Sequence, residues 1–453
     1  MKRKRKFKLS TTHTIMLSFV FAILMGSLLL SLPISTESGE SVSYIDALFT
    51  ATSATCVTGL VTLHTATTWS MFGQAVILLL IQIGGLGIIT IVAGIMVALH
   101  KKIGITNSQL VGDAFNLNSL SGLAQFVKKV LLGTFIIEGC GALLYMTVFV
   151  PEFGARGIWI SVFNSVSAFC NAGMDVISEN SLCAYASHPL VNTVTSLLII
   201  LGGLGFIVWW DILRVLCDYK TAGLGCFRKL TLHTKIVLSA TVLLIVGGAM
   251  LIFLFEYNNP LTIGELSLFD KIQASLFQSV TTRTAGFATI SQENLTNPTA
   301  IVCLILMLVG GSPIGTAGGI KTVTVVVLCA TAYSTINNKN EVSIFNRDLS
   351  RQTTRKAVAV SCMALGITLV STVLLSAVTP ASVIDIMYET VSATATVGLT
   401  RNLTPSLNEI GKIIIMATMY LGRVGPISLA VAFQSKKRTQ NIITNPTEEV
   451  SIG

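Results

Sequence analysis

The sequence IDALFTATSATCVTG at residues 45–59 decides how this chain folds. Its first half reads as a short helix, and its second half is a run of small residues that ends at Gly59. A similar stretch, IDIMYETVSATATVG, occupies residues 384–398, with the same thirteen-residue step from aspartate to glycine. Looser copies end at Gly173 and Gly286. The four terminal glycines are separated by 114, 113 and 112 residues, so the chain is a fourfold internal repeat.

The composition is that of an integral membrane protein. Only 11% of the 453 residues are charged, 52% are hydrophobic, and the mean hydropathy is +0.75. A soluble chain of this length would carry about 25% charged residues to cover its polar surface. Apolar runs long enough to cross a bilayer lie at residues 14–32, 72–99, 127–150, 190–213, 236–255, 300–332, 357–378 and 410–433. We therefore expect an all-α membrane protein with eight transmembrane helices and no separate soluble domain.

The distribution of basic residues predicts the orientation. The cluster Lys2–Lys6 precedes an apolar run, as in a signal peptide, but cleavage there would remove the first helix of one repeat. We interpret the cluster as a cytoplasmic anchor, which with eight crossings puts both termini inside. The inner connectors and tails then hold most of the 30 Lys and Arg residues, and the outer segments hold Arg156, Lys271, Arg401 and Lys412. The net charge of +9 thus reflects topology and some contact with anionic lipid, and indicates no nucleic-acid surface.

The repeat divides the chain into units. Residues 1–13 form a basic cytoplasmic N-terminus and residues 434–453 a cytoplasmic C-terminus. Cytoplasmic connectors are expected at 101–126, 217–233 and 334–356. The four repeats then occupy residues 14–100, 127–216, 234–333 and 357–433.

Each repeat contains a short helix between two spanning ones. A helix of about ten residues cannot cross a hydrocarbon core of about 30 Å, so we expect it to enter from outside and the following turn to return to the same side. Such backbone is stable at membrane depth only where protein or a watery cavity surrounds it. Four such re-entrant loops around one axis would enclose a pore, with negative helix ends favouring a cation and turn carbonyls as ligands. Glycine permits the positive φ that aims successive carbonyls at one line. Any one of the four glycines taken alone could instead be an ordinary packing or turn residue.

Two charged residues stand close to this predicted cation path. Arg283 precedes the third turn, and Glu389 lies in the fourth short helix. Because a buried charge needs a partner, we predict that Arg283 and Glu389 pair and brace the turns from behind. Glu138 is another acid within the spans.

The second helix of every repeat carries a cluster of glycines. We interpret Gly84–Gly87 and Gly202–Gly205 as sites of close helix packing. The third cluster differs, because five glycines and a proline fall within residues 310–319 of a long apolar segment, where no continuous helix is expected. Lying below the turns, this loop is predicted to be a gate, with a structural kink as the alternative. Its residues are Gly310, Gly311, Ser312, Pro313, Gly315, Thr316, Ala317, Gly318 and Gly319.

Basic residues accompany the predicted gate. Arg423, within Gly422–Pro426 of the fourth repeat, has the equivalent depth, and we expect it to bond carbonyls of the 310–319 loop; a packing role is the alternative. Lys321 follows the loop and is expected to face the inner vestibule. The cytoplasmic connectors contain no glycine-rich nucleotide fingerprint. Regulation by nucleotide would therefore require another subunit.

Together these residues resemble the Trk/Ktr/HKT superfamily of potassium transporters over essentially the whole chain. The motifs are residues 55–60, 170–173, 283–287, 310–321, 396–400 and 422–426. With no extra N-terminal pair of helices, the chain is most similar to the Ktr-type bacterial membrane subunit. The resemblance implies four helix–pore-helix–helix units in pseudo-fourfold arrangement around one pore, homodimers in the cell membrane, and a cytosolic RCK-type (KtrA-like) regulatory ring. ATP or ADP would bind that ring only, and this chain would need no cofactor of its own.

The resemblance also assigns residues to roles. The selectivity filter for K⁺ falls on Thr55, Cys56, Val57, Thr58, Gly59, Cys170, Asn171, Ala172, Gly173, Thr284, Ala285, Gly286, Thr396, Val397 and Gly398. The intramembrane loop of the family falls on Gly310–Gly319 and its gate-linked arginine on Arg423. In this superfamily a serine at the position of Gly59 accompanies sodium permeation, so Gly59 favours potassium, with sodium stimulating transport.

Three other functions compete with a gated potassium uptake pore. The first is a sodium-permeable or weakly selective member of the same superfamily. The second is an intramembrane enzyme, which would need a cluster of catalytic or metal-ligating side chains that the spans lack; the nine cysteines form no CxxC pair and indicate neither disulfides nor a metal site. The third is a secondary transporter with broken helices, which predicts a twofold repeat.

Overall fold

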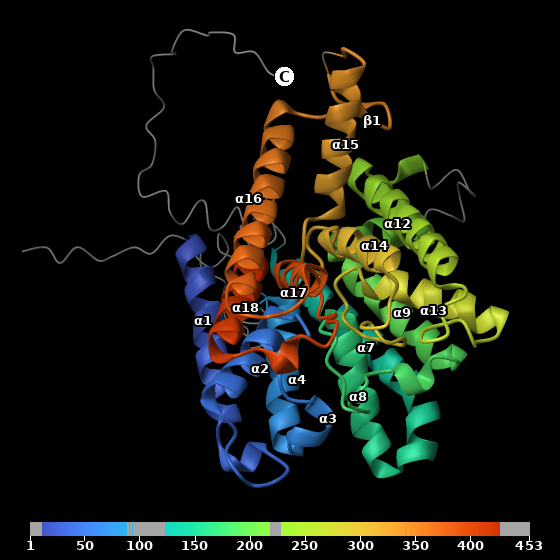
Figure 1. The fold of residues 1–453 in the computed structure, drawn as a ribbon. Coiled ribbons are helices and arrows are strands. Elements are labelled where there is room, and N and C mark those ends of the chain that lie inside the picture. The colour runs from blue at the N-terminus through green and yellow to red at the C-terminus, as the bar shows by residue number, and fades with distance from the viewer. Residues whose placement is uncertain are drawn as a thin grey trace, which may run out of the picture.

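The computed structural model of this chain describes residues 11–87, 90, 93, 123–217, 228–339 and 341–425. The basic cluster at 2–6, most of the connector predicted at 101–126, part of that predicted at 217–233, Pro426 and the tail predicted at 434–453 lie outside the described residues. The described fold is helical, apart from one two-stranded hairpin (Figure 1).

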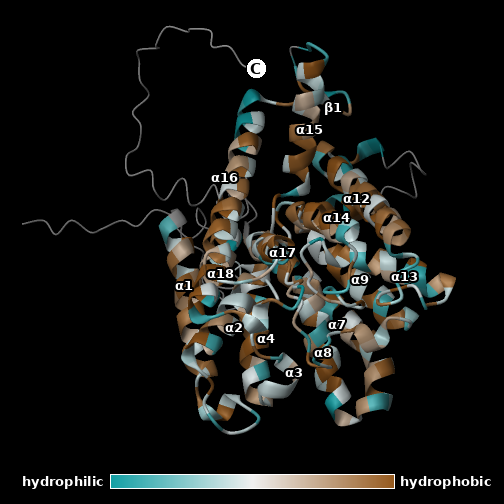
Figure 2. Cartoon of the chain, in the orientation of Figure 1, coloured by the Kyte–Doolittle hydropathy of each residue, from teal (hydrophilic) through white to brown (hydrophobic). Residues whose placement is uncertain are grey.

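Each repeat begins with a long apolar helix. These helices are α1 (Thr11–Leu30), α7 (Leu123–Phe153), α12 (Leu232–Glu256) and α16 (Arg351–Ser376). They are the four helices of the described residues that are long and apolar enough to cross a membrane alone, and a bent pair, α9 and α10, would make a fifth span. Hydrophobic residues predominate along α1, α12 and α16, as Figure 2 shows. The chain is thus a multi-pass membrane protein by its helices, and the count of eight crossings stays a prediction.

A short helix follows each long one, and a second apolar helix follows that. The short helices, called pore helices here, are α2 (Tyr44–Cys56), α8 (Ala155–Cys170), α13 (Leu268–Thr281) and α17 (Val383–Ala395). The second helices are α4 (Met71–Leu86), α9 (Pro189–Leu204), α14 (Asn297–Leu308) and α18 (Glu409–Val424). The remaining helices are η1 (Pro33–Ser35), α3 (Thr65–Thr68), η2 (Cys183–Tyr185), α10 (Phe206–Cys217), α15 (Thr322–Ile336) and η4 (Thr404–Ser406).

Helices α15 and α16 extend beyond the other helices at the top of Figure 1. The antiparallel strands β1 (Ser343–Ile344) and β2 (Arg347–Asp348) join them, with Ser343 opposite Asp348. This hairpin lies within the connector predicted at 334–356.

Serine caps start the third and fourth pore helices. The Ser267 hydroxyl accepts the Asp270 N–H at 3.2 Å, and the Ser382 hydroxyl accepts the Asp385 N–H at 3.2 Å. Each cap satisfies an N–H that the helix leaves unpaired, and the aspartate in the first turn is stabilised by the helix dipole. Since peptide dipoles align along the chain, the negative C-terminal end of each pore helix points at the turn that follows.

The repeats contact one another in a closed cycle. Each second helix packs on the pore helix of the next repeat: α4 on α8, α9 on α13, α14 on α17, and α18 on α2. Each long helix also packs on the pore helix of its own repeat. The last repeat therefore meets the first, and the pore helices lie at the centre of the fold.

The glycine clusters of the second helices do more than the close packing that we predicted. Gly84, Gly202 and Gly422 do pack closely, because a methyl group on any of them would overlap the carbonyl of Thr55, Phe169 or Thr394. However, three of these helices also end at a glycine with φ between 81° and 88°, namely Gly87, Gly205 and Gly425. At Gly205 the chain continues into α10 at a bend of 98°. The run at 190–213 is consequently not one straight helix, since a glycine at positive φ ends it.

Candidate ion pathway

The turns that follow the four pore helices share one backbone feature. In each turn a residue at positive φ stands two positions before a glycine that is also at positive φ. The first residues of these pairs are Val57, Asn171, Thr284 and Thr396, and their φ values lie between 51° and 66°. The glycines are Gly59, Gly173, Gly286 and Gly398. Positive φ at alternate residues orients the peptide carbonyls of the turn. Residues other than glycine rarely adopt this conformation without strain.

Serine and threonine side chains hold these turns. In the first and fourth turns the geometry is the same: Ser53 and Ser392 each accept the N–H of the turn glycine at 3.0 Å. In the second turn the Ser167 hydroxyl donates to the carbonyl of Met174, and in the third Thr281 donates to that of Phe287 at 2.6 Å. The two turns in which a serine accepts the glycine N–H belong to the first and fourth repeats, whose sequences match best.

The four turn glycines form a ring. A methyl group added to Gly59 would overlap the carbonyl oxygen of Ala172, and one on Gly173 would stand 2.6 Å from that of Ala285. On Gly286 it would stand 2.5 Å from the carbonyl of Val397, and on Gly398 it would overlap that of Thr58. Each glycine thus contacts the carbonyl that precedes the next glycine, and the fourth contacts the first. The ring is called the glycine ring below.

Several hydroxyl groups around the glycine ring have no hydrogen-bond partner. They are the Oγ1 atoms of Thr55, Thr58, Thr284 and Thr396, all on residues with no exposed surface. The Nδ2 atom of Asn171 is likewise buried without a partner. A buried polar group normally finds a partner. The unpartnered hydroxyl oxygens around the converging turns therefore indicate a binding site for a cation.

Three of the predicted filter residues lie in helices and not in the turns. Thr55 and Cys56 form the end of α2, and Cys170 is the last residue of α8. Cys56 packs in an apolar cluster with Ile23 and Phe49. The turns themselves comprise residues 57–59, 171–173, 282–286 and 396–398, and α2 and α8 continue further into the small-residue run than its composition indicated.

A cavity of about 580 Å³ opens on one side of the glycine ring, and all four ring glycines line it. Its walls come from the segments that follow the turns, including residues 174–183, 286–293 and 398–405. Three carboxylates line it, on Asp175, Glu179 and Glu293, and none of its lining residues is a lysine or arginine. The cavity therefore favours cations. Burial raises the pKa of Asp175 to about 6.

The 310–319 segment forms a loop between α14 and α15, with no helix in it. Its two ends are joined, because the Gly310 N–H donates to the Ile320 carbonyl at 2.9 Å and the Ile320 N–H to the Leu308 carbonyl at 3.2 Å. The loop lines no part of the cavity. It contacts residues that precede the ring glycines: Thr316 donates to the Asn171 side chain at 3.2 Å, and Gly318 packs against Thr396. The loop and the cavity thus lie on opposite sides of the glycine ring.

Repeat 2 supplies most of the polar contacts of the loop. The N–H groups of Ser312 and Thr316 donate to the carbonyls of Gly203 and Gly202, at 2.8 and 3.1 Å. The Thr316 hydroxyl donates to the Phe169 carbonyl at 3.0 Å. Gly311, Pro313 and Gly315 also approach the residues around Gly203, which leaves no room there for a larger side chain.

Arg423 ties the loop to the first repeat. Its Nη1 donates to the Thr316 carbonyl at 2.7 Å and its Nη2 to the Gly84 carbonyl at 2.6 Å. The predicted contact with a carbonyl of the loop is confirmed. Lys321 turns back onto the loop, where its Nζ donates to the Ala317 carbonyl at 2.6 Å. Arg423 and the repeat 2 contacts thus hold the loop to repeats 1, 2 and 4, and Lys321 adds a bond within repeat 3.

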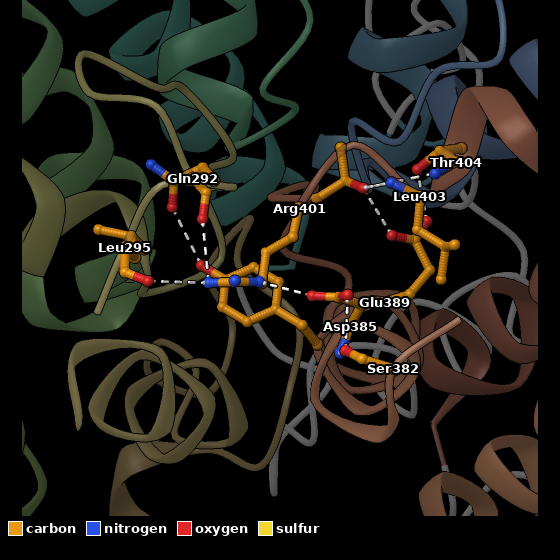
Figure 3. Close-up of polar contacts among 10 residues, drawn as sticks. Gln292, Leu295, Ser382, Asp385, Glu389, Arg401, Leu403 and Thr404 are labelled. Carbon is orange, nitrogen blue, oxygen red and sulfur yellow. Dashed lines mark hydrogen bonds and ion pairs between the residues drawn. The ribbon is translucent and has the colours of Figure 1, made fainter. Parts of the chain in front are cut away.

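The predicted pair between Arg283 and Glu389 is wrong. Glu389 accepts hydrogen bonds from Thr400 at 2.7 Å and from Thr404, so hydroxyls of the segment after its own turn satisfy the carboxylate (Figure 3). Arg283 instead points to the long helix of its repeat and donates to Thr241 at 3.4 Å. Both side chains are buried, at 6% and 0% exposed.

The ion pair near the fourth pore helix joins Arg401 to Asp385, at 2.7 Å. Arg401 also donates to the carbonyls of Gln292 and Leu295, both at 3.3 Å, which links the third repeat to the fourth (Figure 3). Asp46, which corresponds to Asp385 in the first repeat, pairs with Lys412 of α18 at 2.6 Å. Sequence reasoning assigned these basic residues to the outer segments without partners; the shared aspartate of the two repeats was the available signal.

A buried amide network also joins the third and fourth repeats. The side chains of Gln278 and Gln292 bond each other at 2.7 and 3.0 Å, and the Tyr388 hydroxyl donates to Gln292 at 3.0 Å. Glu138 has a similar place between the first two repeats, where it accepts from Gln82 at 3.2 Å. These contacts brace the pore helices from behind and depend on side chains far apart in the chain.

Comparison with known proteins gives a family and several relatives. The family model TrkH, described as cation transport protein, matches residues 2–443. The chain is 39% identical to the potassium/sodium uptake protein NtpJ of Enterococcus hirae, over 100% of this chain and 99% of that protein. It is also 39% identical to the Ktr system potassium uptake protein B of Bacillus subtilis, over 96% and 95% of the two chains. The protein of the same name from Vibrio alginolyticus is 35% identical, over 100% and 97%.

A solved structure has the same fold. The crystal structure of the potassium transporter TrkH from Vibrio parahaemolyticus matches with a TM-score of 0.73, over 96% of this chain and 87% of that one. At 17% identity this match supports the helical membrane architecture alone.

Proposed function

The chain belongs to the TrkH family of cation transport proteins, and from that premise we propose that it takes up potassium ions through the glycine ring. The observation that carries the proposal is the closed cycle in which each ring glycine contacts the carbonyl before the next one. Four helix–pore-helix–helix units in pseudo-fourfold arrangement would produce such a cycle. The relatives are transport proteins by name, which supports a function other than catalysis.

The filter chemistry follows from the turns. Backbone at alternating positive φ aims carbonyl oxygens toward a common line, and a set of such oxygens can replace the hydration shell of K⁺. The unpartnered hydroxyls of Thr284 and Thr396 add oxygen ligands on the side of the ring that faces the 310–319 loop. The negative ends of the four pore helices favour a cation at the same place.

The 310–319 loop serves as the gate in this proposal. It lies directly behind the ring, five of its ten residues are glycine, and hydrogen bonds join it to repeat 2. Arg423 holds the loop and adds a fixed positive charge, which raises the energy of a cation leaving the ring. Opening would require the Arg423 and Thr316 contacts to break.

The names of two relatives refer to a Ktr system. We extend this to the present chain: it assembles as a homodimer in the cell membrane with both termini cytoplasmic, and a cytosolic RCK-type ring that binds ATP or ADP controls the loop. Sodium ions stimulate uptake. No organic cofactor belongs to this chain.

A second candidate is a transporter that also passes sodium. The relative NtpJ, whose name includes both ions, is 39% identical to this chain, as is the Bacillus protein whose name includes potassium alone. The presence of Gly59 at the first ring position favours potassium as the main ion.

The two candidates are distinguished by uptake of K⁺ and Na⁺ in cells that lack their own potassium uptake systems. The wild-type chain is expected to restore K⁺ uptake, and Gly59→Ser to reduce the preference for K⁺ over Na⁺ by about tenfold or more, since a side chain there displaces the Ala172 carbonyl. Equal uptake of both ions by the wild type would support the second candidate. Absence of uptake with a co-expressed regulatory ring would contradict both.

A further inference from the structure

Basic side chains gather where the starts of α7 and α12 meet α10. The Lys129 Nζ of α7 lies 5.5 Å from the centre of the Trp210 ring of α10, as in a cation–π contact. Arg214 stands one helical turn after Trp210 on the same face of α10. Its Nη2 donates to the carbonyl of Lys229, just before α12, at 3.5 Å, and the neighbouring Arg228 is exposed. Lys129, Arg214, Arg228 and Lys229 are together called the basic surface below.

The basic surface contains little negative charge. Asp211 is the only acidic residue in the three described segments that form it, 124–135, 206–217 and 228–239. Asp211 is 7% exposed and accepts the N–H and the hydroxyl of Thr231, at 2.9 and 2.8 Å. Arg214 pairs with Asp211 at 2.5 Å through Nη2 alone, and its side chain is 62% exposed. The other N–H groups of this guanidinium are therefore open to a ligand.

The lengths of two apolar runs place the basic surface at the level of the lipid headgroups. On α7 an apolar run fills residues 130–150, directly after Lys129, and on α12 another fills residues 236–255, directly after Lys235. At about 1.5 Å per residue, each run extends for roughly the 30 Å of a hydrocarbon core. The Lys235 Nζ donates to the Arg228 carbonyl at 2.9 Å, which holds that segment at the same level.

Exposed leucines accompany these charges on α10. Leu213 and Leu216 are 48% and 45% exposed, and they stand on either side of Arg214 in the sequence. Helix α10 also turns away from α9 by 98°, so it does not continue along the direction of that apolar helix. Basic and leucine side chains on one short helix are typical of a helix at the membrane boundary. A ligand that matches this surface has an anionic head and hydrocarbon chains, whereas a soluble partner would meet the protein beyond the headgroups.

We propose that the basic surface binds the phosphodiester group of an anionic membrane phospholipid, with the acyl chains along Leu213 and Leu216. The Lys129 ammonium and the open N–H groups of Arg214 donate to the phosphate oxygens, and Arg228 adds positive charge. A zwitterionic phospholipid carries its own cation and gains less from this surface.

The same helix contacts the 310–319 loop at its other end. The Phe206 N–H donates to the Ile314 carbonyl at 3.0 Å, and a methyl group on Gly205 would stand 2.6 Å from the Pro313 carbonyl. A lipid that fixes α10 therefore also fixes this side of the loop. This second step rests on the proposed function, in which the loop obstructs the pathway. The bound lipid then lowers uptake in the absence of the regulatory subunit.

Lipid binding to the purified full chain tests the site without a measurement of transport. Native mass spectrometry gives the apparent Kd for phosphatidylglycerol and for phosphatidylcholine with the same acyl chains. We expect the wild type to bind phosphatidylglycerol more tightly. The triple variant Lys129→Gln/Arg214→Gln/Arg228→Gln should lose roughly tenfold in affinity for phosphatidylglycerol alone. Lys129→Gln by itself should lose about threefold, and this milder variant carries the test if the triple variant does not fold.

The matched control removes the same charge from another helix. Arg351→Gln/Arg355→Gln/Lys356→Gln neutralises three exposed residues in the first turns of α16, the long helix of the fourth repeat. Its affinity for phosphatidylglycerol should stay close to that of the wild type. Equal losses in the two triple variants, or equal affinity of the wild type for the two lipids, would overturn the proposal.

Two further outcomes would also contradict a lipid site. Displacement of phosphatidylglycerol by millimolar glycerol 3-phosphate would identify a soluble phosphate compound as the ligand. Unchanged lipid binding in a Lys129→Gln/Arg214→Gln/Arg228→Gln variant that no longer assembles with the regulatory ring would assign the basic surface to that protein.

Uptake into vesicles tests the link from α10 to the loop. Vesicles of phosphatidylcholine are compared with vesicles that also contain phosphatidylglycerol, without the regulatory subunit. Phosphatidylglycerol should lower K⁺ uptake by the wild type and leave uptake by the triple variant of the basic surface unchanged. The surface potential of the vesicles acts on both proteins, so equal responses would reject the link. Absence of uptake by the wild type in both kinds of vesicle would contradict the proposed function, whereas the lipid Kd values decide the site independently.

Discussion

Gly398 packs directly on Thr58, although 340 positions separate the two residues in the chain: a methyl group on Gly398 would overlap the Thr58 carbonyl and stand 2.9 Å from the Cα of Gly59. This contact closes the ring between the last repeat and the first. At Gly398 the backbone also has φ of 94°, which a larger residue rarely adopts.

Gly398→Ala should consequently abolish most of the uptake. Strain of about 1–3 kcal/mol at such a position, on a contact that defines the ring, corresponds to a loss of roughly tenfold to a hundredfold. Potassium uptake at equal amounts of protein in the membrane measures it. Gly366→Ala is the matched control, because no atom lies within 4 Å of the added methyl group in the middle of α16; similar losses for both variants would mean that the ring is not the cause.

Substitution of Arg423 should loosen the gate. Arg423→Gln removes the charge and cannot reproduce both bonds to Thr316 and Gly84, so the loop is held less firmly. We expect uptake without the regulatory subunit to rise several-fold on this account. Uptake by Arg423→Lys should rise less, because lysine keeps the positive charge. It should still rise, because lysine has no planar guanidinium to bond both carbonyls. Uptake that stays dependent on the subunit in Arg423→Gln would refute the role assigned to the loop.

The hydroxyl of Thr316 should have a related effect. Thr316→Val removes the bonds to the Phe169 carbonyl and to Asn171, at nearly constant volume. We expect higher uptake together with a lower preference for K⁺ over Rb⁺, because the side chain of Asn171 loses its fixed position. Thr331→Val in α15, whose hydroxyl bonds only its own helix at Val327, serves as the control. Equal ion preference in Thr316→Val and the wild type would mean that the loop does not influence ion selection at the proposed filter.

Arg283 and Glu389 should behave as independent residues. Because each has its own partners, the change in apparent stability of the double variant Arg283→Met/Glu389→Gln should equal the sum of the single changes within about 0.5 kcal/mol. Thermal unfolding in detergent gives the three values. A deviation from additivity well beyond that margin would indicate that the two side chains interact directly.

The Arg401 pair provides a contrast. Arg401→Gln removes the bond to Asp385 and those to the carbonyls of Gln292 and Leu295. Hydrogen bonds to a charged group contribute about 1.5–3 kcal/mol. We expect the unfolding temperature to fall more for Arg401→Gln than for Asp385→Asn, which removes the carboxylate charge beside Arg401 and Ser382 but leaves Arg401 on the carbonyls. The reverse order would mean that the link to the third repeat contributes nothing.

Sequence reasoning predicted the features that depend on short-range pattern. The repeated Asp-to-Gly step and the glycine-rich loop of the third repeat depend on residues close together in the chain, and the four short helices and the loop lie where expected. The 98° bend at Gly205 was missed because Gly202–Gly205 serves both packing and a break, and composition cannot separate these roles. The partners of Arg283 and Glu389 were missed for a different reason: Glu389 accepts from hydroxyls that follow its own turn and Arg283 donates to Thr241 of its own repeat, whereas charge alone pointed to a pair between the two.

Because the ring is built from one polypeptide, its quarters need not be alike. A channel assembled from four identical chains must accept each substitution four times, whereas this chain places Val57, Asn171, Thr284 and Thr396 at corresponding positions. A single codon change alters one wall of the passage and leaves three intact. Separate quarters can thus be fitted to separate contacts, as where Asn171 and Thr396 both touch the 310–319 loop.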